Sequence, residues 1–258
     1  MEPVTPLSYV VTGAGPGIGK ALVERLLDAG GRVVAIDLDP ASLAWTRDRA
    51  RSGLTAVVGD AADEPVVEHA ADLAQSSGTL VGWVNNAAVF QDASVHSASP
   101  RAVLDLIAKN LDPYVVGCSV AVRRFLGAGG GGAIVNVSSH QARRPVPGSL
   151  PYATAKAAVE GFTRALAVEY GPHGIRANAV APGTVATERY QEDLARLGEA
   201  GTRVGRETGL LHALGRVALP DEVAAAIVHL LSDDASFVSG ATVPVDGGRS
   251  VLAREPER

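Results

Sequence analysis

Short apolar runs rich in β-branched residues alternate with longer alanine- and leucine-rich segments along this chain of 258 residues. Some runs are apolar almost throughout, such as Ala-Ile-Val-Asn-Val at 133–137, which predicts strands that are buried on both faces. Strands that alternate with helices predict a parallel, right-handed, doubly wound sheet. The sequence therefore predicts an α/β protein with a Rossmann-like sheet of about seven strands and helices on both faces.

The pattern also predicts where the elements lie. Strands are expected at 9–12, 32–37, 55–59, 80–85, 133–138, 176–181 and 242–245. Helices are expected near 18–29, 40–50, 64–76, 100–126, 152–170 and 220–231. Because no linker interrupts this alternation, we expect one domain over residues 1–258. The mixed segment at about 184–219 is expected to form one or two short helices as a substrate lid, and about 249–258 to be a loose tail.

Composition limits the function classes. A net charge of −5 with interspersed signs lacks the basic footprint of a nucleic-acid binder. The single cysteine cannot form an internal disulfide, and the six histidines lack metal-ligand spacing, so no metal site is predicted. The chain start lacks the basic segment of a signal peptide, and no apolar stretch reaches the roughly 18 residues of a membrane span. We therefore expect a cytoplasmic protein without nucleic-acid or membrane partners.

The first predicted strand leads into a glycine-rich turn, Thr12-Gly-Ala-Gly-Pro-Gly-Ile-Gly19, which is followed by a predicted helix. Such glycines let backbone amides approach a pyrophosphate at the positive end of the helix. The spacing of Gly13, Gly17 and Gly19, with Gly15 as an extra, differs from the common Gly-x-Gly-x-x-Gly fingerprint. A glycine-rich turn that binds no ligand is the alternative. The strand before and the helix after favour a nucleotide site.

Acidic residues follow the next two predicted strands. Asp37 ends the second strand, 18 residues after Gly19, where a carboxylate accepts hydrogen bonds from adenosine ribose hydroxyls and repels a 2′-phosphate. No basic residue adjoins it, so NAD is predicted as cofactor over NADP. Asp39 is the alternative if the strand ends later. Asp60, after the third strand, is predicted either to bind the adenine amino group or to cap the next helix.

Tyr152 and Lys156 are four residues apart in a predicted helix, so their side chains leave the same face. A phenol has a pKa of about 10, and a neighbouring ammonium lowers it, which makes the pair a candidate proton donor and acceptor. Only three of the 23 basic residues are lysines, and lysine offers a compact ammonium where arginine offers a flat fork. The alternative is two partly exposed residues on an amphipathic helix.

Five motifs together resemble the short-chain dehydrogenase/reductase family, in its single-domain branch. They are Thr12-Gly-x-x-x-Gly-x-Gly19, Asn85-Asn-Ala87, Ser139, Tyr152-x-x-x-Lys156 and Pro182-Gly183, in the order and spacing of that family. The resemblance extends from Tyr9 to Gly248. One departure is Ala88, where the family has glycine; the added methyl group narrows that strand end slightly.

The resemblance implies a role for each catalytic residue. Tyr152 is implied to be the general acid/base, and Lys156 its activator and a ligand of the nicotinamide ribose. Ser139 is implied to polarise the substrate oxygen; Ser138 competes for that role, but a position thirteen residues before Tyr152 favours Ser139. Asn110 is implied to hold a water that leads toward Lys156.

The resemblance also implies an NAD site at the carboxyl ends of the strands, where doubly wound sheets bind their ligands. The implied cofactor residues are Gly13, Gly15, Gly17, Ile18, Gly19, Asp37, Asp60, Asn86, Tyr152, Lys156, Pro182, Gly183, Thr184 and Thr187. Pro182, Gly183 and Thr184 would flank the nicotinamide, and Thr187 would bind the carboxamide or the pyrophosphate.

Other residues have open alternatives. Pro113 is expected either to kink a helix beside Asn110 or to lie in its first turns. His140 is expected either to contact substrate or to be a loop residue. Arg143 and Arg144 are expected to be solvated or intersubunit, with a substrate carboxylate as the alternative. Cys118 is expected to be a small core residue.

These features predict an NAD-dependent oxidoreductase that interconverts a secondary alcohol and a ketone. A catalytically silent dinucleotide sensor of the same fold is the alternative, because fold does not imply activity. An epimerase or dehydratase of the longer branch is disfavoured, since few residues remain after Pro182. The resemblance implies a small-molecule partner and a homotetramer or homodimer built through the helices near 100–126 and 152–170.

Overall fold

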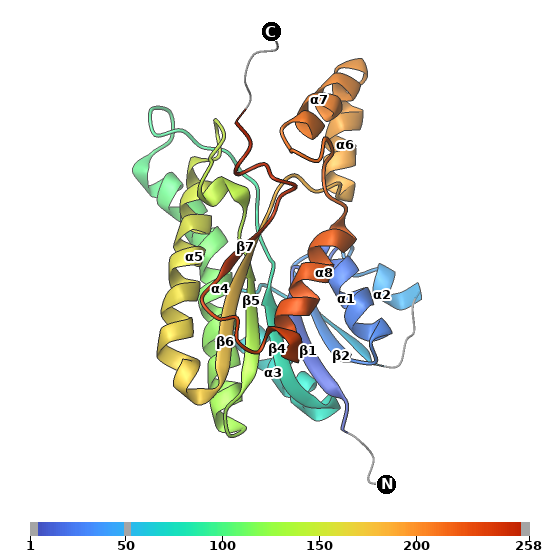
Figure 1. Ribbon diagram of the computed structural model, residues 1–258, viewed down its shortest axis with the longest axis vertical. Helices are drawn as coiled ribbons and strands as arrows, with labels where there is room; N and C mark the ends of the chain where they lie inside the picture. The colour runs from blue at the N-terminus through green and yellow to red at the C-terminus, as the bar shows by residue number, and fades with distance from the viewer. Residues whose placement is uncertain (1–4, 49–52, 254–258) are drawn as a thin grey trace.

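The computed structural model describes residues 5–48 and 53–253, and seven parallel strands form one sheet in it (Figure 1). The strand order is β3-β2-β1-β4-β5-β6-β7, and each strand is parallel to its neighbours in the sheet. The chain reverses its direction of travel across the sheet between β1 and β4. In open α/β sheets the ligand crevice lies at that reversal. The predicted doubly wound, Rossmann-like sheet is confirmed.

The strands agree with the expected ones to within two residues at each end. They are β1 (Leu7–Thr12), β2 (Arg32–Asp37), β3 (Leu54–Val58), β4 (Thr79–Asn85), β5 (Gly132–Val137), β6 (Ile175–Pro182) and β7 (Thr242–Val245). Successive side chains of a strand point to opposite faces. Val10 and Trp83 enter one core, whereas their neighbours Val11 and Val84 enter the other. Burial on both faces explains why these runs are apolar throughout.

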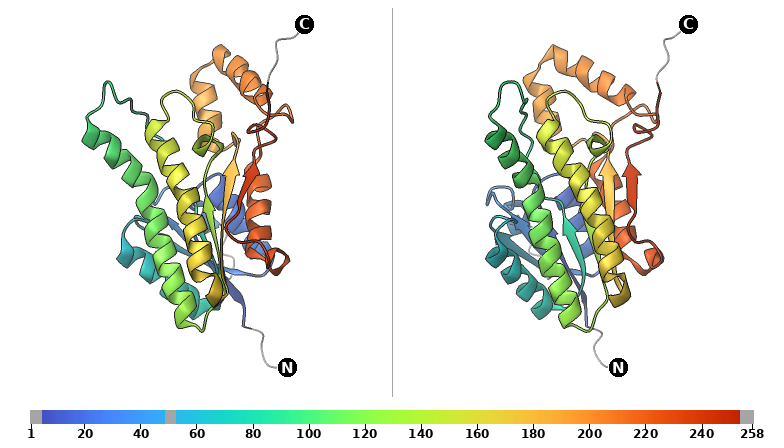
Figure 2. Two further views of the ribbon diagram at one scale, coloured as in Figure 1. Left: turned by 60° about the vertical axis from the view of Figure 1, so that its left-hand side comes forward. Right: turned by 90° about the vertical axis from the view of Figure 1, so that its left-hand side faces the viewer.

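Helices cover both faces of the sheet. They are α1 (Ile18–Asp28), α2 (Trp45–Asp48), α3 (Glu64–Ser77), α4 (Pro100–Gly127), α5 (Leu150–Tyr170), α6 (Glu188–Arg196), α7 (Glu199–Leu210) and α8 (Pro220–Leu231), with short 3₁₀ segments η1 (His140–Ala142), η2 (Gly171–His173) and η3 (Asp233–Ala235). Residues of α3, α4 and α5 share one core, and residues of α1 and α8 share the other. Figure 2 shows α4 and α5 lying side by side across their face.

The predicted extent of the helix at 40–50 is wrong, because the helix in the structure is shorter. The described part of that segment begins with turns, in which Ser42 N donates to Asp39 O and Leu43 N to Pro40 O, and only Trp45–Asp48 is helical. The Asp39 carboxylate accepts from Ala41 N at 2.9 Å. Such side-chain bonds offer the backbone an alternative to a helix, which the apolar periodicity does not register. Residues 49 and 50 lie outside the described residues.

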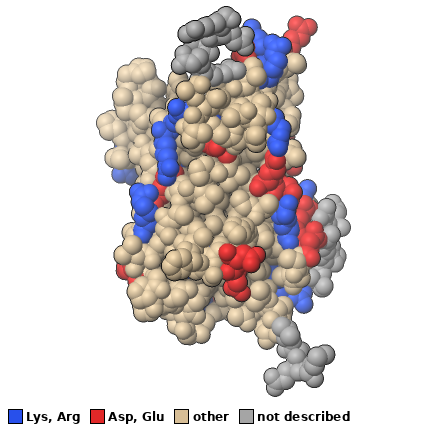
Figure 3. Space-filling view, viewed as in Figure 1, with Lys and Arg blue, Asp and Glu red and all other residues tan. Residues whose placement is uncertain are grey.

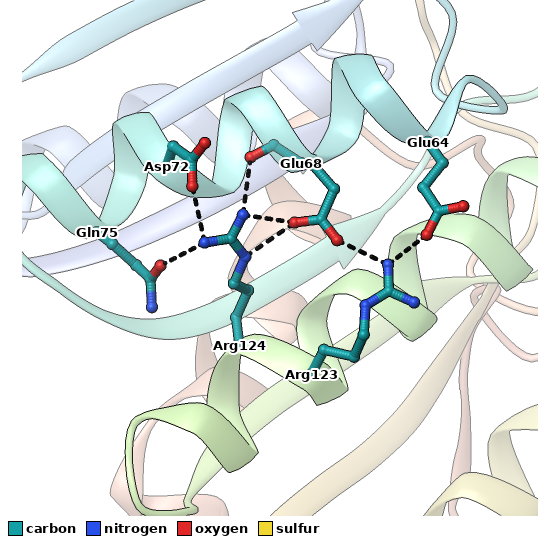
Figure 4. A network of polar contacts seen from close by, with 6 residues as sticks. All are labelled: Glu64, Glu68, Asp72, Gln75, Arg123 and Arg124. Atoms are coloured by element: carbon teal, nitrogen blue, oxygen red, sulfur yellow. Dashed lines mark hydrogen bonds and ion pairs between the residues drawn. The ribbon is translucent and has the colours of Figure 1, made fainter.

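An ion-pair network fastens α3 to α4 (Figure 4). Arg124 donates to Glu68 from Nε at 2.9 Å and from Nη2 at 2.5 Å, and Arg123 donates to Glu68 at 2.7 Å and to Glu64 at 2.5 Å. The Arg124 and Glu68 side chains are only 24% and 30% exposed, so water screens this pair less than an ordinary surface pair. The network supports the position of α4, which carries Asn110.

The predicted lid segment contains two helices, α6 and α7, as expected, and they stand at the top end of the molecule in Figure 1. The expected loose tail is wrong at its start. Arg144 Nη1 donates to the carbonyls of Arg249 and Leu252 at 3.0 and 3.2 Å, and Arg249 Nη1 donates to Thr184 Oγ1 at 2.7 Å. These hydrogen bonds of the Arg144 and Arg249 guanidinium groups hold the start of the tail against the rest of the protein. Residues 254–258 lie outside the described residues.

Charged side chains of both signs are interspersed on the face shown in Figure 3, without one extended basic surface. This is the distribution expected from the net charge of −5. Within residues 5–48 and 53–253, no helix is both long enough and apolar enough to cross a bilayer.

Candidate active site

A cavity of about 570 Å³ lies at the carboxyl ends of the strands, where the chain reverses across the sheet. It brings together residues from the glycine turn, from the ends of β2, β4, β5 and β6, from α5 and from the start of the lid. The residues predicted from the sequence that line it are Gly13, Gly15, Ile18, Gly19, Asp37, Asn86, Ser139, Tyr152, Lys156, Pro182, Gly183, Thr184 and Thr187. The sequence motifs therefore converge on one crevice.

The glycines of the turn are required by close packing and backbone conformation. A Cβ atom on Gly19 would lie 2.0 Å from the carbonyl oxygen of Gly13, and one on Gly13 would lie 2.7 Å from Ala87. Gly17 has a φ of 106°, which L-residues with side chains rarely adopt. No side chain caps the N-terminus of α1, so its backbone amides remain directed at the site of an anion.

Asp37 lies where a nucleotide ribose would be read. Its Oδ2 accepts from Gly15 N at 2.9 Å and its Oδ1 from Asp39 N at 3.1 Å. The carboxylate is thus held between the glycine turn and the end of β2 and borders the cavity. Asp39, the alternative, instead bonds Ala41 N and the Ser42 hydroxyl in the exposed turn after β2. These residues fit a dinucleotide.

Asn86 joins the end of β4 to the glycine turn. Its Nδ2 donates to Gly13 O at 2.7 Å, and its backbone N donates to the Thr12 hydroxyl at 3.1 Å. The same hydroxyl accepts from Ala87 N at 3.3 Å. These bonds fix two strand ends that are 73 residues apart in the chain. The neighbouring Asn85 lies below the cavity and bonds Asn136 and Cys118 in the core.

Tyr152 and Ser139 meet in the cavity. Tyr152, in the first turn of α5, is 8% exposed, and Ser139, just past β5, is 7% exposed. Burial raises the pKa of Tyr152, and the neighbouring Ser139 hydroxyl acts against that rise. Ser139 Oγ also accepts from Gln141 N at 3.1 Å. The competing Ser138 directs its hydroxyl to the Lys156 carbonyl and to Glu160, so the geometry favours Ser139.

Lys156 bonds a residue that the sequence reasoning did not identify. Its Nζ donates to the Tyr114 hydroxyl at 2.5 Å and to the carbonyl of Val137 at 2.8 Å. The Tyr114 hydroxyl donates to the same carbonyl at 2.8 Å. Both side chains are at most 1% exposed. Tyr114 lies one helical turn after Asn110 in α4, and this spacing is the signal that could have identified it.

The expected lowering of the Tyr152 pKa by Lys156 is wrong in direction. Burial raises the pKa of Tyr152 to about 12, with the Ser139 hydroxyl and the Arg189 charge acting against it. Burial also lowers the pKa of Lys156 to about 7, because desolvation disfavours both charged forms. Lys156 Nζ lies 5.4 Å from the centre of the Tyr152 ring and bonds Tyr114 instead. Desolvation of the phenol, which depends on packing and is not visible in the spacing of Tyr152 and Lys156, is the largest effect on its pKa.

Three predicted residues do not line the cavity. Asn110 lies behind it, where its Oδ1 accepts from Val89 N at 2.9 Å and its Nδ2 donates to Leu106 O at 3.1 Å. Asp60 is exposed and accepts from Ala62 N, and Asp63 is the N-cap of α3, so the alternative that Asp60 caps this helix is wrong. Gly17 packs against the lid, since a Cβ there would lie 2.9 Å from Thr187 Cγ2.

Pro113 lies inside α4, thirteen residues after its first residue, so the alternative that it lies in the first turns is wrong. Its ring nitrogen cannot donate to the carbonyl of Lys109. Pro113 and Tyr114 are both buried. The freed carbonyl therefore lies in the same stretch of α4 as Asn110 and Tyr114.

The remaining candidates have partners within the chain. Arg143 Nε donates to the buried Glu160 at 3.0 Å, and Arg144 binds the tail. Both arginines are exposed, so the expected solvated role is confirmed, and the intersubunit role stays a prediction. His140 is 6% exposed and borders the cavity. Cys118 is fully buried, as expected, and burial raises its pKa to about 12.

The substrate side of the cavity has further residues that the sequence reasoning missed. Phe90 lies over Tyr152 with ring centroids 4.8 Å apart, and the Arg189 guanidinium lies 4.6 Å from the centre of the Phe90 ring. His212, in the lid segment, accepts from Thr184 N at 3.1 Å through Nε2. Among the described residues, no three His, Cys, Asp or Glu side chains gather as a metal ion would require.

Comparison with known proteins agrees with this geometry. Residues 13–250 match a family model described as Enoyl-(Acyl carrier protein) reductase. The chain is 37% identical to the short-chain reductase protein NovJ of Streptomyces niveus, over 93% of this chain and 92% of that one. It is 35% identical to the D-threitol dehydrogenase of Mycolicibacterium smegmatis, over 94% and 92%.

Solved structures are similar as well. The ligand-free aldohexose dehydrogenase of Thermoplasma acidophilum is 30% identical, with a TM-score of 0.86 and coverage of 98% of each chain. The similarity therefore includes the glycine turn, the strand ends and the helix that carries Tyr152 and Lys156. The chain belongs to the short-chain dehydrogenase/reductase family, whose members are oxidoreductases that use NAD or NADP.

Proposed function

We propose that this protein interconverts a secondary alcohol and a ketone with NAD, with Tyr152 as the general acid/base. The observation that carries the proposal is that Tyr152, Ser139 and Lys156 share one cavity with the glycine turn and Asp37. Two relatives are named as dehydrogenases of D-threitol and of aldohexoses, and both names denote compounds that carry CH–OH groups. No observation favours the alternative of a silent sensor.

The cofactor residues support the preference for NAD. The glycine turn and the uncapped end of α1 would hold the pyrophosphate, and Asp37 would accept the ribose hydroxyls and exclude a 2′-phosphate. Pro182, Gly183 and Thr184 border the same cavity beside Ser139 and would hold the nicotinamide end. Asp60 is proposed to reach the adenine from the turn after β3.

The chemistry divides between cofactor and protein. NAD, when bound, supplies the hydride chemistry. Ser139 and Tyr152, which line the same cavity, would both bond the substrate oxygen and stabilise its changing charge. Tyr152 would move the proton at that oxygen. Lys156, buried and bonded to Tyr114 and Val137 O, would place positive charge near the phenol below its own pKa of about 7, and Asn110 would order this part of α4.

Incubation of the full chain with NAD or NADP and panels of secondary alcohols and ketones tests the proposal. Absorbance of the reduced nicotinamide is expected to increase with alcohols and NAD, and to decrease with ketones and NADH. No change with any compound and either cofactor would contradict the proposal. Turnover with NADP alone would contradict the assignment of Asp37.

Alcohol oxidation is expected to accelerate with pH. Tyr152 must begin as a phenolate to take the proton, and burial raises its pKa to about 12. Below that pKa the phenolate fraction grows about tenfold per pH unit. kcat/KM for oxidation should therefore rise from about pH 7 to about pH 10, whereas ketone reduction, which needs the phenol, should not rise. Initial rates in both directions at constant ionic strength measure this, and a flat oxidation profile would contradict it.

Tyr114→Phe is expected to lower kcat/KM for oxidation near pH 7 and to have less effect near pH 10. A hydroxyl that accepts from an ammonium favours its charged form, and such a bond is worth about 1.5–3 kcal/mol. Its loss lowers the pKa of Lys156 further below about 7, so less of the ammonium that supports the phenolate remains near neutral pH, whereas near pH 10 the amine is neutral with or without Tyr114.

The pH dependence of kcat/KM for oxidation measures the Tyr114 effect. Tyr170→Phe is the matched control, since Tyr170 lies at the far end of α5 and outside the cavity. If the pH profile of Tyr114→Phe coincides with that of the unmodified protein, Tyr114 does not influence proton transfer by Tyr152.

The closure of the lid segment over substrate and the oligomeric state of the protein stay predictions. α6 and α7 are proposed to close over substrate, because Thr187 at the N-cap of α6 already contacts the glycine turn at Gly17. The predicted homotetramer or homodimer would cover α4 and α5, on which Leu104 and Val168 are 56% and 81% exposed. A cytoplasmic location also stays a prediction.

A further inference from the structure

His140 follows Ser139 directly and is buried at the edge of the cavity, with 6% of its surface exposed. Its Nδ1 lies 3.1 Å from the carbonyl oxygen of Pro182. A carbonyl accepts only, so Nδ1 carries the proton, and Nε2 of the neutral ring is an acceptor. Nε2 is buried and has no hydrogen-bond partner within residues 5–48 and 53–253. A buried acceptor without a donor is unfavourable in free energy.

Gln141, the residue after His140, also has a buried acceptor without a partner in the described part of the chain. Gln141 also borders the cavity, and its Oε1 is buried without a partner. Its backbone N donates to Ser139 Oγ at 3.1 Å, which ties the position of η1 to that of the serine. Among the described residues, two buried acceptors without a partner therefore follow directly after Ser139. The catalytic mechanism uses neither of them.

The surroundings of His140 keep its ring neutral, so that Nε2 remains a hydrogen-bond acceptor. Burial lowers the pKa of His140 to about 4, and the nearby Arg249 and His212 act in the same direction, whereas the Pro182 carbonyl and Asp246 act against it. The ring is thus neutral at physiological pH. An acceptor that cannot become a cation binds a hydroxyl and does not attract a carboxylate or phosphate.

We propose that His140 Nε2, assisted by Gln141 Oε1, binds a second hydroxyl group of the substrate, next to the carbon that reacts. The substrate class is therefore a vicinal diol or polyol, and its product an α-hydroxyketone. This inference rests on the proposed function, since it places the reacting oxygen at Ser139 and Tyr152. The donors at that oxygen and the acceptors beside it then match two neighbouring hydroxyl groups of one molecule.

Substrate pairs with one carbon skeleton test the proposal. The full chain is assayed with NAD on 2-butanol against 2,3-butanediol and on cyclohexanol against trans-1,2-cyclohexanediol. The diol is expected to have a kcat/KM about 10- to 100-fold higher in at least one pair, since sites built to bond a hydroxyl discriminate strongly against analogues that lack it. This exceeds the statistical advantage of two equivalent hydroxyl groups.

Two variants separate the acceptor from the packing. His140→Asn keeps an amide donor near the position of Nδ1 but ends short of Nε2. The ratio of kcat/KM for the diol to kcat/KM for the alcohol is therefore expected to fall to about the statistical advantage of two equivalent hydroxyl groups. His140→Gln reaches the position of Nε2 and is expected to restore part of the ratio. His229→Asn, an exposed histidine on α8, is the matched control and should leave the ratio unchanged.

The outcomes separate the two proposals. Turnover of the alcohols with equal kcat/KM for the diols overturns the further inference and leaves the proposed function standing. A diol preference that persists in His140→Asn also overturns it, because another group must then bind the second hydroxyl. Absence of turnover with every compound overturns the proposed function itself.

Discussion

Tyr152→Phe is expected to lower kcat for both oxidation and reduction by about 10²–10⁴-fold, the contribution of a positioned general acid/base. The substitution removes one oxygen and leaves the ring, which packs against Phe90 at 4.8 Å between centroids. The glycine turn and Asp37 are untouched, so affinity for NAD should remain nearly intact. Steady-state rates with a secondary alcohol and titration of NAD by fluorescence or calorimetry measure the two quantities.

Tyr170→Phe provides the matched control for the same deletion. Tyr170 is the last residue of α5, eighteen residues after Tyr152, or about 27 Å along the helix. This variant should keep full activity. If Tyr152→Phe retains activity within a few-fold of Tyr170→Phe, Tyr152 is not the general acid/base, whatever its place in the cavity.

Asp37→Asn is expected to reduce the selectivity for NAD over NADP by about 10- to 100-fold. Asparagine keeps an oxygen that can accept from Gly15 N, as Oδ2 of Asp37 does at 2.9 Å, so the glycine turn is preserved. The charge-assisted bonds to the ribose weaken by about 1–1.5 kcal/mol, and the repulsion of a 2′-phosphate disappears. The ratio of kcat/KM with the two cofactors measures the change.

Asp39→Asn distinguishes the two aspartates. Asp39 bonds Ala41 N and the Ser42 hydroxyl in the exposed turn after β2, so its substitution should leave cofactor selectivity unchanged. A selectivity change in Asp39→Asn, together with none in Asp37→Asn, would transfer the ribose contact to Asp39.

The strands were predictable because burial on both faces leaves a strong local signal. β2 and β7 begin and end at the expected residues, and the chain then needs only right-handed crossovers to set the order of the sheet. The segment at 40–50 was not predictable in this way. There a few bonds of Asp39 outweigh a weak helical preference, and such local competition is not visible in apolar periodicity.

Convergence of the site was also predictable, because parallel strands end at one edge of the sheet. Ser139, Asn86 and Pro182 each follow a strand, and all three line the cavity. Position alone does not reveal partners. The Asn110 side chain is occupied by Val89 N and Leu106 O, and the internal partners of Arg143 and Arg144 come from residues up to 108 positions away.

Sequence alone determined the sheet, the glycine turn, the acidic end of β2 and the spacing that places Tyr152 and Lys156 on one face, because each depends on neighbours within a few residues. Tertiary structure decided the protonation of the site. Whether the phenol is made more or less acidic depends on how much water is removed from it and on which group receives the ammonium. Burial raises the pKa of Tyr152 to about 12, and Tyr114 binds Lys156; both follow from packing between helices distant in the chain.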